Sequence, residues 1–108
     1  MRIKKNVQQL ENSLDNVMKL RAVEFEWNEN VYPHIYDLLK RFDRLKSLGF
    51  IAQDVRKFYP EVVDTDERGY YTMNYGKLNA VLIEAIKEQQ VFIDKINQDL
   101  KDIEIKLN

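Results

Sequence analysis

The order of apolar and polar positions predicts several short elements in the first two thirds of the chain. Through residues 6–20 the apolar residues recur at three- and four-residue spacing, which predicts a helix with Asn6 as its N-cap. In residues 21–28, Val23, Phe25 and Trp27 alternate with small or polar residues, which predicts a strand with one buried face. We interpret Trp27 as a core residue rather than as part of a ligand site.

The middle of the chain mixes helical and extended patterns. Pro33 suits a first helical turn, and the apolar spacing after it predicts a helix within residues 29–47. In the stretch GFIAQDVRKFYPEVV, residues 49–63, a short apolar run predicts a buried strand and QDVRKFY predicts a two-turn helix. Pro60 ends that helix, because the residue before a proline is disfavoured in the helical region. A strand, a polar turn containing Gly69 and a second strand then form a predicted hairpin.

Residues 76–108 carry a heptad pattern that is typical of a coiled coil. A helix of this length extends roughly 50 Å and needs partners to bury its apolar stripe. Isoleucine at both core positions favours three strands or more, and the polar Gln89 in the seam is predicted to fix the register. Asp99 and Glu104 flank the seam and would repel each other in a parallel bundle, a repulsion that Lys101 and Lys106 can offset. The seam consists of Ile86, Ile93, Leu100 and Leu107 at position a, and Leu82, Gln89, Ile96 and Ile103 at position d.

Together these elements predict an α+β fold. We expect a small antiparallel sheet packed on short helices, followed by a long C-terminal helix that begins near Asn74 or Tyr75 and forms a trimeric coiled coil. The predicted sheet is packed on helix 6–20. We divide the chain into a globular part, 1–75, and a trimerisation helix, 76–108. The four predicted strands of the sheet are residues 21–28, 48–52, 62–64 and 70–73.

Composition narrows the classes of function. The chain has 108 residues, 32% of them charged, and a net charge of −1 with basic residues spread along its length, so we expect no nucleic-acid partner. No apolar run approaches the ~20 residues of a membrane span, so we expect no membrane partner. The chain contains no cysteine and only one histidine, His34, which excludes disulfides and a histidine zinc site within one chain. A carboxylate metal site stays open, but the sequence has no calcium-loop spacing, so we expect no cofactor and no bound metal.

Three stretches, taken in order, resemble a known family. They are LRAVEFEWNE (20–29), GFIAQDVRKFYPEVV (49–63) and GYYTMNYGKLNAVLIEAIKEQQ (69–90). In this order and spacing they resemble the intramolecular chaperone auto-processing domain found at the C-terminal end of bacteriophage tailspikes, tail fibres and neck appendages. Residues 30–47 look like a family-variable insertion, to which we assign no function.

The resemblance implies a C-terminal chaperone that forms a homotrimer, assists folding of the preceding spike or fibre part of the same polypeptide, and then cuts itself off. It implies a serine nucleophile in a Ser-Asp-x-Arg-x-Lys motif with the lysine as general base. Arg2 and Lys4 match the arginine and lysine of that motif, whose Ser-Asp pair would lie just before Met1 and is absent from these 108 residues. The chain would then be part of a single-turnover self-cleaving serine endopeptidase, inactive by itself, and the expected location is the host bacterial cytoplasm during virion assembly.

Two other readings compete with this one. A trimeric coiled-coil adaptor with a small α/β part and no chemistry would show the same heptads. An independent enzyme fits poorly, because the hydroxyls of Ser13, Ser47, Thr65 and Thr72 have no histidine nearby in sequence.

Overall fold

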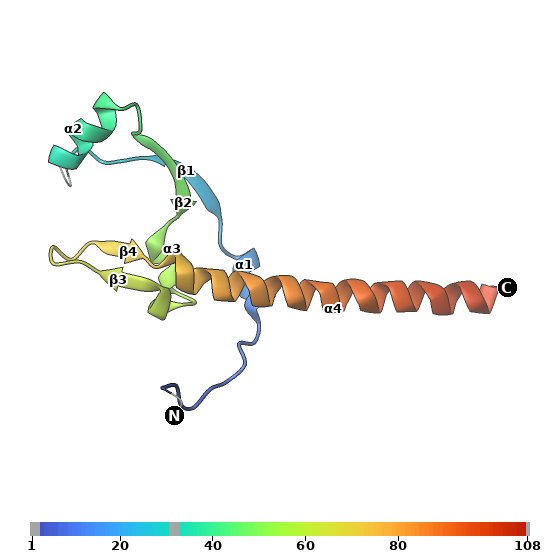
Figure 1. The fold of residues 1–108 in the computed structure, drawn as a ribbon. Coiled ribbons are helices and arrows are strands. Elements are labelled where there is room, and N and C mark those ends of the chain that lie inside the picture. The colour runs from blue at the N-terminus through green and yellow to red at the C-terminus, as the bar shows by residue number, and fades with distance from the viewer. Residues whose placement is uncertain (1–2, 31–32, 108) are drawn as a thin grey trace. The chain divides into compact units, whose positions relative to one another are not determined.

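The structure is a computed structural model that describes residues 3–30 and 33–107. It contains two compact units. One unit combines the N-terminal segment up to Lys19 with the chain from Asn74 onward, and the other is formed by Leu20–Met73. The fold is α+β, as predicted, with short antiparallel strand pairs and a long C-terminal helix (Figure 1).

A first hairpin opens the Leu20–Met73 unit. Strand β1 (Ala22–Glu26) pairs antiparallel with β2 (Lys46–Phe50), and the backbone N–H of Trp27 donates to the carbonyl of Leu45 at 3.0 Å beyond the ladder. Helix α2 (Pro33–Arg41) lies between the two strands in the sequence and at the end of this hairpin in space. The predicted strand 21–28 and the helix that starts at Pro33 are both confirmed.

The stretch GFIAQDVRKFYPEVV supplies the core of this unit. Helix α3 (Ala52–Arg56) and the 3-10 helix η1 (Pro60–Val62) follow β2 directly. Val55, Tyr59 and Val62 are buried, with 0%, 5% and 1% of their surfaces exposed. The compact strand-to-helix stretch therefore places three core residues within eight positions of sequence.

The boundary between β2 and α3 differs from the prediction. The apolar run was expected to stay extended through residue 52, but β2 ends at Phe50 and the carbonyl of Ile51 accepts the N–H groups of Asp54 at 3.0 Å and Val55 at 3.2 Å. A short apolar run is compatible with either a strand or a buried helix, so periodicity does not locate this boundary.

The predicted second hairpin is confirmed. Strand β3 (Val63–Thr65) pairs antiparallel with β4 (Tyr71–Met73). In the connecting turn Asp66 Oδ1 accepts the N–H groups of Arg68 and Tyr70, both at 2.9 Å. Gly69 has a φ of +84°, which glycine adopts without the steric cost of a Cβ.

The prediction of one four-stranded sheet is wrong. In the described residues the strands form two separate two-stranded sheets, β1–β2 and β3–β4. Each pair is formed by strands that are consecutive in the sequence, and hydrophobic alternation does not specify which further strand edges pair with each other.

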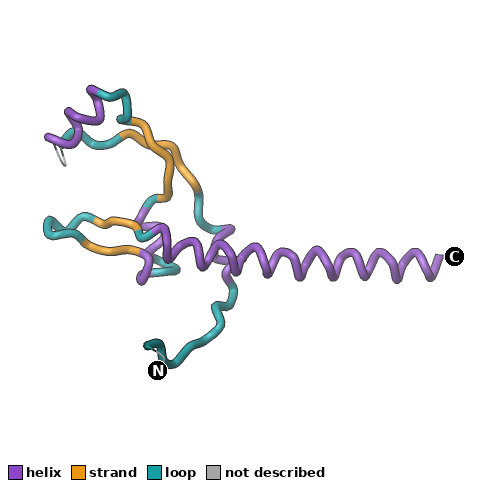
Figure 2. The backbone as a smooth tube through the Cα atoms, in the orientation of Figure 1, coloured by secondary structure: helices purple, strands orange, loops and turns teal. Residues whose placement is uncertain are grey.

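Helix α4 (Tyr75–Leu107) is the long helix of the other unit, and it begins where the sequence predicts. Asn74 caps it, because the Oδ1 of Asn74 accepts the N–H of Lys77 at 3.1 Å. Helix α1 (Ser13–Met18) packs along α4 and is only six residues long (Figures 1 and 2).

The predicted helix over residues 6–20 is therefore wrong in its first half. Asn6 is not its N-cap; the N-cap is Asn12, which adopts a left-handed conformation with a φ of 58°. Val7 is 76% exposed, so the apolar residues before Asn12 do not form the buried stripe that the spacing predicted.

Candidate functional site

The N-terminal segment is held on α4 by two carboxylates. Gln9 donates from Nε2 to Glu84 Oε2 at 2.8 Å. The backbone N–H of Ser13 donates to Glu88 Oε1 at 3.2 Å, and the N–H of Leu14 donates to Glu88 Oε2. Both oxygens of Glu88 thus accept backbone donors from the start of α1, which leaves neither N–H without an acceptor.

Ser13, one of the two residues that donate to Glu88, is buried. Ser13 is 0% exposed, and its Oγ has no hydrogen-bond partner among the described residues. Sequence reasoning missed this contact, because Glu84 and Glu88 are separated from their partners by 74 or 75 positions and no local pattern marks them.

The two residues that match the processing motif lie at the start of this segment. Lys4 is exposed and lies outside any helix or strand. Arg2 lies outside the described residues. Residues 4–8 are exposed, and the contacts of the segment with α4 begin at Gln9, five positions after Lys4.

Helix α4 carries two apolar stripes with different environments. Leu78, Val81 and Ala85 are buried. The predicted seam lies on another stripe, where Leu82 is half-buried and Gln89 is exposed. The other seam positions are exposed by 44–82% of their surfaces: Ile86, Ile93, Ile96, Leu100, Ile103 and Leu107.

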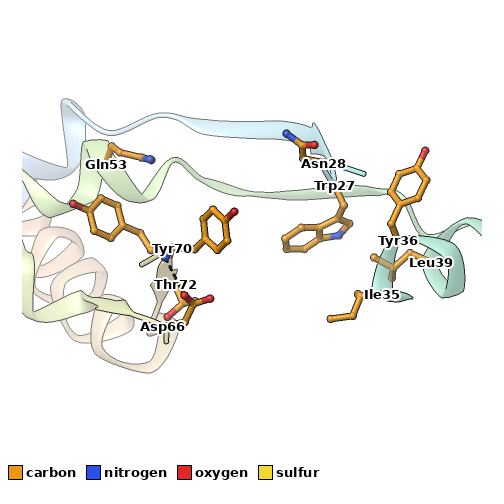
Figure 3. A pocket seen from close by; sticks show the side chains of 10 residues that line it. Trp27, Asn28, Ile35, Tyr36, Leu39, Gln53, Asp66, Tyr70 and Thr72 are labelled. Carbon is orange, nitrogen blue, oxygen red and sulfur yellow. Dashed lines mark hydrogen bonds between the residues drawn. The ribbon is translucent and has the colours of Figure 1, made fainter. Parts of the chain in front are cut away.

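A pocket of about 300 Å³ lies within the Leu20–Met73 unit (Figure 3). Trp27, Ile35 and Tyr36 contribute to its lining, together with Tyr70 and Tyr71. Trp27 is 49% exposed, so its interpretation as a core residue is wrong: the indole stacks edge-on against Phe25 at a centroid distance of 5.0 Å and otherwise faces the pocket. The carboxylate of Asp66 reaches the pocket, but its Oδ1 is engaged by the turn backbone.

The described part of the chain offers little other site chemistry. No group of three or more His, Cys, Asp or Glu side chains in residues 3–30 and 33–107 is arranged to hold a metal ion. Within the same residues, no helix combines the length and the apolar character needed to cross a membrane.

Comparison with known families identifies a match. The sequence model of the family described as the chaperone of endosialidase (Peptidase_S74) matches residues 1–64. This range includes Lys4, β1, the buried stretch at Val55 and the start of β3, and it ends before α4. A comparison with curated proteins finds no match.

Proposed function

Because this chain belongs to the chaperone of endosialidase family, we propose that it is a C-terminal intramolecular chaperone that trimerises and assists folding of a phage tailspike or tail fibre in the same polypeptide. In this proposal, residues 76–108 are the trimerisation helix and residues 1–75 form the chaperone and processing part. The proposed place of action is the host bacterial cytoplasm during virion assembly. The freed domain would be released from the spike or fibre or stay transiently associated with it.

The exposed seam of α4 is the observation that carries this proposal. Beyond Glu88 every described residue of α4 is exposed, yet Ile93, Ile96 and Ile103 recur at heptad spacing along it. Burying one such side chain is worth ~1.5–3 kcal/mol, so a long helix with this stripe gains stability by association with copies of itself. Isoleucine at both core positions favours three strands or more over two.

A helix-rich trimer suits the task of a folding helper. Trimeric β-structures depend on pairings between distant residues and fold slowly, with exposed edges that aggregate. A trimer built from local helical contacts forms sooner and keeps three client chains together, which raises their effective concentration to the millimolar range typical of short tethers. Removing the helper afterwards would leave the fibre unable to unfold and refold by the same route, which is kinetic stability.

We also propose that the uncut parent releases this domain by self-cleavage through a Ser-Lys mechanism. A serine placed before Met1 attacks the carbonyl carbon that precedes it, and its hydroxyl proton passes to the neutral amine of Lys4. The peptide C–N bond breaks as the lysine returns the proton to the freed nitrogen, and water hydrolyses the ester that remains. Arg2 would orient the scissile carbonyl.

A fusion protein tests the cleavage. Placing Ser-Asp before Met1, behind a short upstream segment, should produce one cut on the N-terminal side of that serine, seen as two bands on a denaturing gel. Lys4→Ala and Lys4→Met should leave one band and an intact trimer. Lys5→Ala is the matched control, since Lys5 is the neighbouring exposed lysine, and it should be cut like the parent. Equal cutting of the Lys4 variants would remove Lys4 from the mechanism.

The alternative is a trimeric coiled-coil adaptor without chemistry. The exposed position of Lys4 favours it, because a catalytic lysine usually lies in a site that shields its amine from water. The adaptor predicts the same trimer, but a Ser-Asp fusion that stays uncut.

A further inference from the structure

We propose that Glu88 is a positioning residue, which clamps the start of α1 to α4 and thereby fixes the path of the segment that carries Lys4. The inference rests on the proposed self-cleavage for its functional consequence. The contacts that define the clamp are independent of that function: Gln9 to Glu84 at 2.8 Å, Ser13 N–H to Glu88 at 3.2 Å, and Leu14 N–H to Glu88.

The spacing of the two acceptors makes the clamp a property of the folded helix. Glu84 and Glu88 are four residues apart and so lie on the same face of α4, one turn from each other. In an extended chain their side chains would be separated by more than 10 Å, at about 3.3 Å for each residue. The segment 9–14 therefore meets both carboxylates only after this part of α4 is helical.

The clamp also joins parts of the chain that are far apart in sequence. Closing a loop of this length costs conformational entropy, which local contacts alone do not repay. Folding of α4, and its proposed association with two copies, supplies that stability. Placement of the Lys4 segment is then coupled to assembly, so cleavage waits until the helper has folded.

Both oxygens of Glu88 are needed to hold the start of α1 on α4. Each accepts a backbone N–H from the first turn of α1, where the donors have no partner within the helix. Ser13 is fully buried in the intact contact, so removing the carboxylate leaves its N–H without an acceptor, which favours local opening of the contact to solvent. Glu88→Gln keeps the side-chain length and one acceptor oxygen, whereas Glu88→Ala removes both acceptors.

Three variants in the Ser-Asp fusion test the inference: Glu88→Gln, Glu88→Ala and the control Asp102→Asn. Asp102 occupies the same heptad position two heptads further along, where its Oδ1 accepts only Gln98 Nε2 at 3.1 Å. The measurements are amide hydrogen exchange at Ser13 and Leu14, and the rate of self-cleavage. Sedimentation and circular dichroism establish that each variant keeps the assembly and the helix of the parent.

We expect exchange at both amides to accelerate by about tenfold or more in Glu88→Ala, by less in Glu88→Gln, and not at all in Asp102→Asn. Cleavage should slow in the same order. This graded order separates positioning from a general loss of fold, because the helix and the assembly are unchanged.

Two results would overturn the inference: unchanged exchange at Ser13 and Leu14 in Glu88→Ala, or accelerated exchange with cleavage as fast as in the parent. If no fusion is cut, including the parent, while exchange follows the expected order, the clamp stands and the proposed self-cleavage is wrong. The two proposals therefore fail by different observations.

Discussion

Val55 is the residue on which the Leu20–Met73 unit depends most directly. Its side chain is completely buried. Tyr59 and Val62, which follow it in the sequence, are 5% and 1% exposed. Among the described residues of this unit no other apolar side chain is buried, so each of these three supports a large share of its stability. A small core of this kind has no spare contacts with which to compensate for a cavity.

Val55→Ala should therefore destabilise the chain by about 2 kcal/mol, through lost burial and the cavity left behind. Urea unfolding at one fixed protein concentration measures this change. Val7→Ala is the matched control, because Val7 is 76% exposed, and it should change the free energy of unfolding by less than about 0.5 kcal/mol. Equal effects of the two substitutions would show that Val55 is not part of the core.

Among the elements, those with local signals were predictable from the sequence. Pro33 marks the start of α2, Gly69 marks the β3–β4 turn, and Asn74 marks the start of α4, and each signal acts within a few residues. A fixed proline φ, a glycine at positive φ and an amide cap are all properties of the local chain, which explains why single-sequence reasoning finds them.

The start of α1 was not predictable in this way. Apolar spacing in residues 6–20 is helical, but Asn12 takes a left-handed conformation and Glu88 supplies the acceptors for the first turn. The separation of the strands into two sheets likewise depends on which edges meet in three dimensions. For the candidate site, the motif match found Lys4, while the anchoring carboxylates and the pocket beside Trp27 arise only from folding.

Helix α4 offers a direct test of its seam. Replacing both Ile93 and Ile96 by Asp puts charges into the proposed core and should give monomers, because each buried isoleucine contributes ~1.5–3 kcal/mol and a buried charge costs more. Ile105→Asp is the control, since Ile105 is 74% exposed and lies off the heptad seam. Size-exclusion chromatography should show monomers for the double variant and the parental size for Ile105→Asp; the same size for both would place the contact elsewhere.

For the protein as a whole, we propose that one small chain performs two tasks. The unit that contains α4 has an exposed apolar seam, and its N-terminal segment contacts the same helix through Gln9. In the proposal, association through the seam stabilises the helix that holds the segment. Assembly and processing would then depend on the same 33-residue helix, so that release of the client follows trimer formation.

Sedimentation equilibrium of the 108-residue chain at micromolar concentration tests trimerisation most directly. We predict a single species at three times the 13.0 kDa mass of one chain, which dissociates on dilution with loss of helical circular dichroism. A monomer at this concentration, or a stable dimer, would contradict the proposed trimeric chaperone.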